Sequence, residues 1–288
     1  TDALWLRAVR SPYWRAAFTL GDFGPLKAKY SGLIDILTAE DVTGINGFGI
    51  YPDIKDQPVL AEGFVRYRGE AVIALIGSAE TIAAIRDDEL PISWQAQEPV
   101  QGFGPPVAER ATQLHDNYPG NILAQGTTLK GDTAKGFTDS AVVFEESFVT
   151  GFVEHGYIEP EAGWAQRVGD RIEVTVTTQS PYMDRDEVAI IMGLAPENVR
   201  IIPTACGGGF GGKLDQTVQP LVALAAWKLN KPVRCTFNRI ESMAATTKRH
   251  PSKITARYGC TGDGKLQAYE FNGDFNTGAY ISWGLTVK

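Results

Sequence analysis

The spacing of apolar and polar residues divides the chain into two groups of predicted strands and helices. In the first hundred residues, apolar runs predict three strands and a helical pattern predicts one helix, at 3–9, 71–76, 91–95 and 79–86 respectively. The apolar run over 32–37 leads to Thr38, which can cap a short helix. The strand–helix–strand order from Ala71 to Gln95 predicts a βαβ unit.

The second group, from about residue 132, predicts a longer alternation. Strands are expected at 141–149, 165–168, 171–177, 199–203, 232–237, 254–258 and 266–271, and helices at 181–192, 216–229 and 239–244. Two strand pairs form predicted hairpins, because Gly169-Asp170 and the stretch 261–264 supply turn residues. Ser180 and Gly193 are the expected boundaries of helix 181–192.

The stretch between these groups is rich in proline and glycine and has no periodic apolar pattern. Such a composition is typical of a linker or an extended segment. We therefore predict an α+β chain with a small domain over residues 1–100, a linker over 101–131 and a second domain over 132–288.

The most distinctive stretch is the glycine loop, Cys206 to Lys213, in which five of eight residues are glycine. It lies between the predicted strand 199–203 and the predicted helix 216–229. Glycine adopts positive φ readily and lets the backbone approach a neighbour closely. A strand, a glycine loop and a helix in this order predict that free backbone N–H groups gather at the helix start and hold an anion or a polar cofactor.

Two nucleotide-binding patterns compete for this loop, and each lacks one part. Gly207-x-x-x-x-Gly212-Lys213 resembles a phosphate loop, but Leu214 stands where a Ser or Thr hydroxyl should bind magnesium. Gly207-x-Gly209-x-x-Gly212 matches a dinucleotide fingerprint, but the next predicted strand leads to Asn238 and offers no acidic residue for a ribose. A tight glycine turn without a ligand is the third alternative.

Composition limits the class of protein. The chain has 288 residues, 43% of them hydrophobic, which is enough for two domains with apolar cores. A net charge of −7 argues against nucleic acid or an anionic membrane as the main partner. The chain has no run of about eighteen apolar residues and its first residues do not form a signal peptide, so we expect a soluble, cytoplasmic protein.

Candidate metal ligands are few and scattered. The three cysteines form no C-x-x-C pair and no two of the three histidines are four residues apart, so no protein-ligated metal is expected. His155 and Glu159 suit either acid–base chemistry or a role as buried hydrogen-bond anchors, and we favour the anchors.

Several separated stretches occur in the order that one enzyme family shows. They are 8–12, 37–42 and 65–72 in the first domain, and 154–160, 178–181, 207–213, 232–234 and 248–251 in the second. In these stretches the chain resembles the molybdenum-binding large subunit of the xanthine dehydrogenase and aldehyde oxidase family, over nearly its whole length. The resemblance implies a hammerhead-type α/β domain followed by the first part of a molybdopterin-binding α+β domain.

The resemblance also implies an activity and a set of partners. Members of the family hydroxylate an aldehyde or an N-heterocycle with water as the oxygen source, using a molybdenum–molybdopterin cofactor that can take a dinucleotide form. Because the pterin supplies most metal ligands, the scarcity of His and Cys is compatible with this cofactor. A [2Fe-2S] centre and FAD are expected on partner chains, namely iron–sulfur and flavin subunits. The family's general base is expected beyond Lys288, on the C-terminal half of the molybdenum subunit, so the catalytic residues are unknown.

At the level of residues, the resemblance implies that the glycine loop forms a wall of the cofactor site. The family loop offers backbone N–H groups and a phenyl ring to the cofactor, and Gln179 matches a family glutamine on a turn beside the loop. The candidate cofactor-binding residues are therefore Gly208, Gly209, Phe210, Gly211, Gly212 and Gln179.

Two positions depart from the family pattern on the substrate side. Val153 stands where many members have a glutamine. Leu214 stands where the xanthine-oxidising branch has an acidic residue, and Asp215 comes one position later. These departures disfavour purine oxidation. The alternative functions are a non-catalytic binding or assembly module of the same family, and a nucleotide-binding protein.

Overall fold

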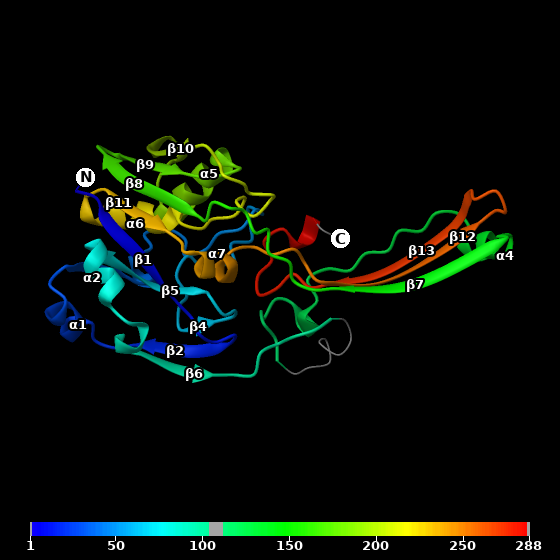
Figure 1. Cartoon of the computed structure of the whole chain (residues 1–288), viewed down its shortest axis with the longest axis horizontal. Helices are drawn as coiled ribbons and strands as arrows, with labels where there is room; N and C mark the ends of the chain where they lie inside the picture. Colours follow the sequence, from blue (N-terminus) through cyan, green and yellow to red (C-terminus); the bar gives the residue numbers. More distant parts are fainter. Residues whose placement is uncertain (1, 104–111, 287–288) are drawn as a thin grey trace. The chain divides into compact units, whose positions relative to one another are not determined.

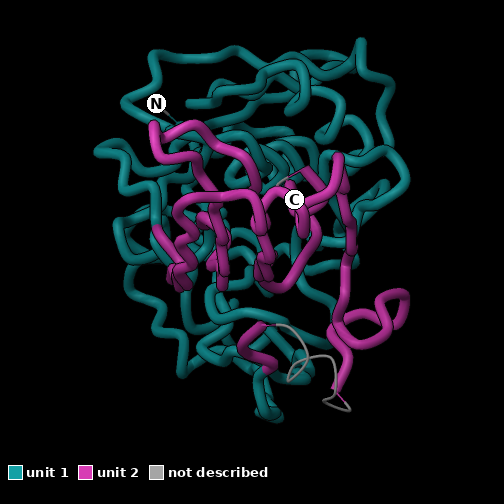
Figure 2. Tube along the Cα trace, turned by 90° about the vertical axis from the view of Figure 1, so that its right-hand side faces the viewer, with its two compact units in different colours: residues 1–99, 154–247 teal, residues 100–153, 248–288 magenta. Residues whose placement is uncertain are grey.

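The structure, a computed structural model, describes residues 2–103 and 112–286. The chain forms two compact units, and each unit is assembled from two separate segments (Figure 2). Unit 1 contains residues 1–99 and 154–247, and unit 2 contains residues 100–153 and 248–288. The predicted second domain is thus divided between the units, and the boundaries at 100 and 131 stay predictions. Within the described residues, no helix is long and apolar enough to cross a membrane.

Unit 1 is built on a mixed seven-stranded sheet with the order β10-β9-β8-β11-β1-β5-β3 (Figure 1). Its strands are β1 Leu4–Arg10, β3 Leu33–Leu37, β5 Ala71–Gly77, β8 Ala162–Val168, β9 Arg171–Val176, β10 Val199–Pro203 and β11 Val233–Thr236. β1 pairs antiparallel with β5 and parallel with β11. The two sequence segments of unit 1 therefore share one sheet.

Apolar burial explains why these segments stay together. In β5, the six residues from Val72 to Gly77 are all buried, as expected for a strand that is covered on both faces. Helix α5 (Pro181–Met192) packs against β10, and helix α6 (Gln219–Leu229) packs against β8 and β9. The first eight residues of α6 are buried on all sides, which is typical of a helix at the centre of a core.

Shorter helices complete unit 1: α1 (Gly24–Lys29), α2 (Ala79–Ala84) and α7 (Arg239–Ala245). The side chain of Asn238 caps α7 by accepting a hydrogen bond from the Glu241 amide at 2.9 Å. Asn238, which occupies the position where a dinucleotide-binding protein has an acidic residue for the ribose, thus has a local structural role.

A second sheet in unit 1 shows that the predicted βαβ unit is wrong. β6 (Ile92–Ala96) pairs antiparallel with β2 (Ala16–Leu20), and β2 also pairs with β4 (Phe64–Val65). β5 and β6 consequently lie in different sheets. The chain leaves α2 after only six residues and passes through a 3₁₀ turn, Asp87–Glu89, before β6 begins. The local apolar pattern marked both strands correctly but carried no information about their pairing partners.

The helix after the glycine loop begins three residues later than predicted. Gln216 donates from Nε2 to the Asp184 carboxylate at 3.0 Å, and the Gln219 side chain accepts from the Thr217 amide at 2.8 Å. Pro220 lies in the first turn of α6, where a missing N–H is not needed. The N–H groups of the glycine loop therefore do not belong to the first turn of a helix, and their predicted place at a helix start is wrong. That they hold an anion or a polar cofactor stays a prediction.

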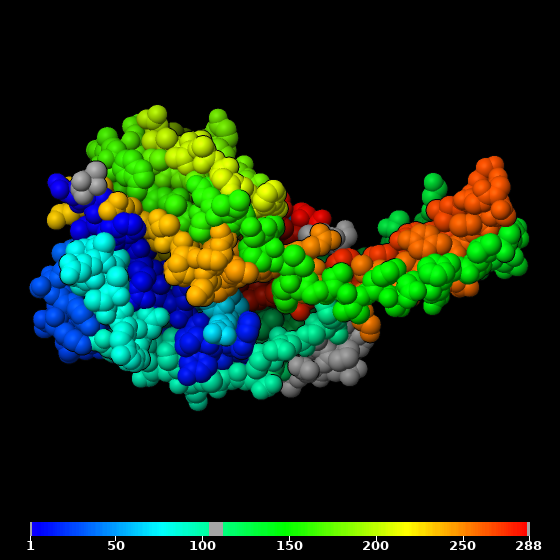
Figure 3. Space-filling model, viewed as in Figure 1, coloured from blue at the N-terminus to red at the C-terminus, as the bar shows by residue number. Residues whose placement is uncertain are grey.

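Unit 2 contains a three-stranded antiparallel sheet with the order β13-β12-β7. The strands are β7 (Val142–Thr150), β12 (Ser252–Cys260) and β13 (Leu266–Phe275), and helix α4 (Thr133–Thr138) precedes β7. Figure 3 shows the orange surface of β12 and β13 beside the green surface of β7. The hairpin predicted around residues 261–264 is present, with longer strands than expected.

Candidate functional site

The glycine loop follows β10 and adopts backbone conformations that few side chains tolerate. The angle φ is +106° at Gly208, +92° at Gly211 and +51° at Phe210. A bulky residue at positive φ is rare and costs about 1–3 kcal/mol, so the surrounding structure has to hold it. The side chain of Phe210 is nevertheless 75% exposed, so its ring gains little from packing within the described chain.

Two side-chain oxygen atoms fasten the loop. Oε1 of Gln179 accepts from the backbone amides of Gly211 at 3.0 Å and Lys213 at 3.2 Å. The backbone N–H of Gln179 donates to the Lys213 carbonyl at 3.1 Å. Oε2 of Glu159 accepts from the amide of Gly207 at 2.6 Å and from Nζ of Lys213 at 3.0 Å. Glu159 is therefore a hydrogen-bond anchor, although it is not buried. The same expectation is wrong for His155, because its buried Nδ1 has no hydrogen-bond partner in the described chain.

Close packing beneath the loop accounts for several of its glycines. A Cβ at Gly208 would lie 2.9 Å from Cβ of Tyr157, and a Cβ at Gly212 would lie 2.7 Å from Cε1 of the same ring. A Cβ at Gly209 would lie 2.4 Å from Oε1 of Gln179. Heavy atoms cannot approach that closely, so at these positions the packing of the chain on itself demands glycine.

Gly211 differs from these positions. A Cβ there would meet only Nε2 of His155, at an ordinary contact distance of 3.8 Å. Steric crowding within the described chain therefore does not exclude a side chain at Gly211, and only its φ of +92° favours glycine. This side of the loop is open to a ligand.

The tip of the loop carries three consecutive backbone amides. The N–H groups of Gly208, Gly209 and Phe210 donate to no acceptor in the described part of the chain, whereas the amides on both sides are satisfied. Buried backbone donors in native proteins are nearly always paired, whereas donors in an exposed loop can bond to water. Gly208 and Phe210 are not buried, so this row of donors can bond either to water or to a ligand that carries several acceptor atoms.

The same geometry argues against both nucleotide-binding patterns. The side chain of Lys213 is only 2% exposed and its ammonium forms an ion pair with Glu159, so it does not face a phosphate. In the sheet, β9 and β8 lie between β10 and β11, whereas a dinucleotide fold needs the strands before and after its first helix to be parallel neighbours.

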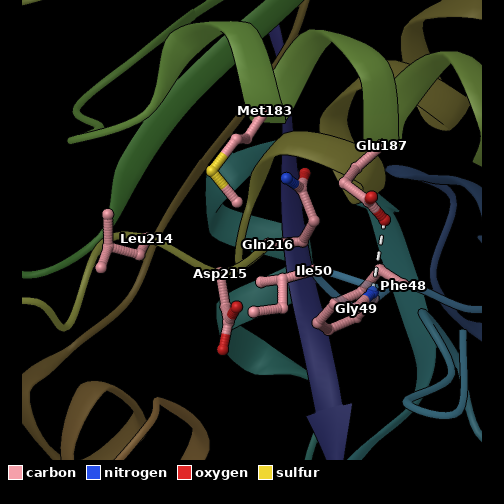
Figure 4. Close-up of a pocket in the computed structure, with 8 residues that line it drawn as sticks. All are labelled: Phe48, Gly49, Ile50, Met183, Glu187, Leu214, Asp215 and Gln216. Atoms are coloured by element: carbon pink, nitrogen blue, oxygen red, sulfur yellow. Dashed lines mark hydrogen bonds between the residues drawn. The ribbon is translucent and has the colours of Figure 1, made fainter. Parts of the chain in front are cut away.

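A small pocket lies just after the glycine loop, within unit 1 (Figure 4). It brings together the substrate-side candidates Leu214 and Asp215, and its other lining residues are Phe48, Gly49, Ile50, Met183, Glu187 and Gln216. One wall is fixed, because Glu187 accepts from the Gly49 amide at 3.3 Å and forms an ion pair with Lys55. The third candidate, Val153, belongs to unit 2, where it forms an antiparallel bridge with Arg249.

Behind this pocket lies a buried carboxyl group that the sequence did not single out. Asp184, in the first turn of α5, is fully buried and accepts from Gln216 at 3.0 Å and Gln219 at 3.3 Å. Burial raises the pKa of Asp184 to about 6, and hydrogen bonds from Thr178 and the two glutamines oppose this rise. Asp184 therefore ties the segment after the loop to α5.

Comparison with known proteins gives a consistent result. The model of the molybdopterin cofactor-binding domain family matches residues 114–288. The chain is 36% identical to a probable xanthine dehydrogenase subunit of Bacillus subtilis, over 99% of this chain and 38% of that protein. It is 33% identical to the nicotinate dehydrogenase large molybdopterin subunit of Eubacterium barkeri, over 99% of this chain and 66% of that protein.

Solved structures agree on the fold. The aldehyde oxidoreductase from Desulfovibrio gigas matches with a TM-score of 0.85 at 24% identity, over 94% of this chain and 31% of that one. Quinoline 2-oxidoreductase from Pseudomonas putida matches with a TM-score of 0.83 at 25% identity, over 95% of this chain and 36% of that one. The chain thus spans between about a third and two thirds of these four proteins.

Asp184 should make folding stability depend on pH. Its pKa is about 6 in the folded state and 3.8 in the unfolded chain, so the folded state keeps the proton longer as the pH rises. The contribution of protonated Asp184 to the free energy of unfolding is therefore present in acid and is lost between about pH 4 and pH 6. At 1.4 kcal/mol per pKa unit, this contribution is up to about 3 kcal/mol. Urea unfolding from pH 4 to 7 should show this loss in the native protein relative to Asp184→Asn. Asp186→Asn, at an exposed position, is the control, and parallel curves for native protein and Asp184→Asn would contradict the assignment.

Proposed function

The chain belongs to the molybdopterin cofactor-binding domain family, among the molybdenum-binding subunits of xanthine dehydrogenases and aldehyde oxidases, and we propose that its glycine loop forms one wall of the cofactor site of a molybdenum hydroxylase. The observation that carries this proposal is the row of three unpaired amides at Gly208, Gly209 and Phe210. Gly211 would leave room for close approach, and Gln179 would hold the loop in place. The bound cofactor would supply the redox chemistry.

Each loop residue has a separate task in this proposal. The three amides donate hydrogen bonds to acceptor atoms of the pterin or its phosphate, and the exposed ring of Phe210 covers an apolar face of the bound group and keeps water away from it. The residues that act directly on the substrate, including a general base, are not among those described for the loop. A dinucleotide form of the cofactor is compatible with the same donors.

For the substrate, we propose an aldehyde or an N-heterocycle over a purine. The support is the residue type after the loop lysine and not the small pocket, which has room for about one water molecule. Leu214 brings an apolar side chain to the position that directly follows the loop lysine, and Asp215 is 7% exposed, which leaves little of its carboxylate for a polar substrate. An apolar side chain contributes contact area but no hydrogen bond, so Leu214 cannot supply the selective polar contact that an acidic residue at this position would make.

A dye-coupled oxidation assay on the assembled, molybdenum-containing enzyme tests the function. We expect turnover with an aromatic aldehyde or with an N-heterocycle such as nicotinate or quinoline, and much weaker turnover with xanthine. A molybdenum-replete enzyme that oxidises none of these compounds would instead support the non-catalytic binding or assembly module. Xanthine as the preferred substrate would contradict the role assigned to Leu214.

Gly211→Asp tests the cofactor wall. The substitution places a side chain and a negative charge on the open side of the loop, so molybdenum per polypeptide should fall by at least about ten-fold, as for other changes beside a metal site. Gly264→Asp is a matched control, because Gly264 has a φ of +85°, has no neighbour within 4 Å and lies in the β12–β13 turn. Both variants share the backbone penalty. Metal analysis and pterin fluorescence should separate them, and equal cofactor contents would count against the proposal.

Partners are proposed on a different observation, the aromatic face of the unit 2 sheet. Opposite residues in antiparallel strands point to the same face, and on one face lie Phe144, Phe148, Tyr258, Tyr269, Phe271 and Phe275. These side chains are between 36% and 56% exposed, and the opposite face is polar, with Lys253, Arg257, Glu270 and Asp274. Large exposed apolar patches mark interaction surfaces.

We propose that this aromatic face is covered by the remainder of the molybdenum subunit. The relatives of B. subtilis and E. barkeri both contain further polypeptide outside the region that this chain matches. A second copy of the same face is disfavoured, because Glu146 lies among the aromatic side chains and would meet its own counterpart. Iron–sulfur and flavin subunits remain the proposed electron acceptors.

Oxidative footprinting can test this assignment. Tyr258, Tyr269 and Phe271 should be labelled readily in the chain 1–288 alone and should be protected several-fold in the assembled enzyme. Val149, which is 73% exposed on the opposite face of the same sheet, should keep its labelling in both samples and serves as the control. Equal labelling of the aromatic residues in the two samples would show that the face stays open.

A further inference from the structure

We propose that Glu159 is a positioning residue that, through Lys213, sets the shape of the glycine loop in which the cofactor is held; this inference rests on the proposed function. A single oxygen atom, Oε2 of Glu159, accepts from the Gly207 amide at 2.6 Å and from Nζ of Lys213 at 3.0 Å. Gly207 and Lys213 stand at the two ends of the run of glycines. One carboxylate oxygen therefore joins the entry of the loop to its exit.

The charge of Lys213 makes this link strong. Its side chain is 2% exposed, and the ammonium lies 3.0 Å from Oε2 of Glu159 and 4.8 Å from the centre of the Tyr157 ring. A charge that is removed from water requires a partner, because leaving it unpaired is strongly unfavourable. The side chain of Glu159 is 32% exposed, so its carboxylate neutralises the Lys213 ammonium while it stays in contact with water. The pair thus holds Lys213 inward and fixes the end of the loop.

Glu159 and Gln179 bind different residues of the loop and share Lys213. Gln179 holds Gly211 and Lys213, and Glu159 holds Gly207 and Lys213. Both contacts end on Lys213, so this residue is the common anchor. The segment 208–210 between the anchored positions is the part whose amides stay unpaired in the described chain. Fixing both ends is what prevents these three donors from rotating to find acceptors within the protein.

The neighbouring Tyr157 and Glu161 support the pair from below. Tyr157 is 1% exposed, its hydroxyl donates to Oε1 of Glu161, and its ring lies under Gly208 and Gly212. Desolvation and the Glu161 carboxylate raise the pKa of Tyr157, so it stays protonated and keeps donating at neutral pH. The Tyr157 ring therefore forms the floor of the loop, and Glu159 holds the loop from one side.

Two variants separate a positioning role from simple charge balance. Glu159→Gln retains an acceptor for the Gly207 amide but leaves Lys213 without a counter-charge. Glu159→Gln/Lys213→Met also removes the buried charge. Glu159→Gln should therefore have a lower melting temperature than the native protein, and the double variant should return to about the native value. If Glu159 positions the loop, both variants of the assembled enzyme should contain about ten-fold less molybdenum and pterin than the native enzyme. Glu173→Gln, which breaks the ion pairs of Glu173 with Arg171 and Arg200 away from the loop, is the matched control.

A second measurement reports on the loop without the cofactor. Cys206 is an exposed free thiol next to Gly207, whereas Cys235 is buried. The rate at which iodoacetamide modifies Cys206 in cofactor-free protein should rise several-fold in both Glu159 variants, because the link through Lys213 that joins the entry of the loop to its exit is broken. The rate should not change in Glu173→Gln. Mass spectrometry of the Cys206 peptide gives this rate independently of activity.

The outcomes are distinguishable. Native cofactor content and native Cys206 reactivity in both Glu159 variants would overturn the inference and leave the proposed function intact. Recovery of cofactor in the double variant alone would also overturn it, since charge balance would then suffice. A native assembled enzyme without molybdenum would refute the proposed function, while faster Cys206 modification in the variants would still support the loop-positioning part of the inference.

Discussion

The candidate site depends on the fastening of a glycine loop by side-chain oxygen atoms. Oε2 of Glu159 and Oε1 of Gln179 accept four hydrogen bonds from the loop, and both reach Lys213. Without such acceptors a run of five glycines would be a flexible turn, because glycine loses more conformational freedom on folding than any other residue. The fastened ends leave the tip, 208–210, with donors that no acceptor in the described chain satisfies and that are available to a ligand.

The sheet of unit 1 provides the rigid support for this arrangement. β1 joins β5 to β11, so the strands of residues 1–99 and those of residues 154–247 belong to one compact unit. The loop leaves this sheet from β10, and the segment that follows it is tied to α5 through the buried carboxyl of Asp184. Late initiation of α6 is a consequence, since Gln216 is engaged with Asp184 instead of extending the helix.

Much of the local structure could be predicted from the sequence, because it follows from short-range patterns. The helix 181–192 has the predicted bounds and ends before Gly193, whose φ is +64°, as expected for its C-cap, whereas the side chain of Ser180 makes no capping hydrogen bond. The two hairpins form where glycine and aspartate supply the turns. The βαβ unit failed for the opposite reason: the pairing of β6 with β2 joins residues about seventy-five positions apart, and no local pattern records it.

The sequence by itself determined that the chain is α+β, that residues 206–213 form a glycine loop after a strand, and that the ordered set of stretches points to one molybdenum-binding family. Only the tertiary structure decided which glycines are demanded by packing on Tyr157 and Gln179, which amides are left unpaired, and that Lys213 turns inward to Glu159. The physical reason is that spacing along the chain specifies local conformation, whereas burial, hydrogen-bond satisfaction and ion pairing arise between segments that only folding brings together.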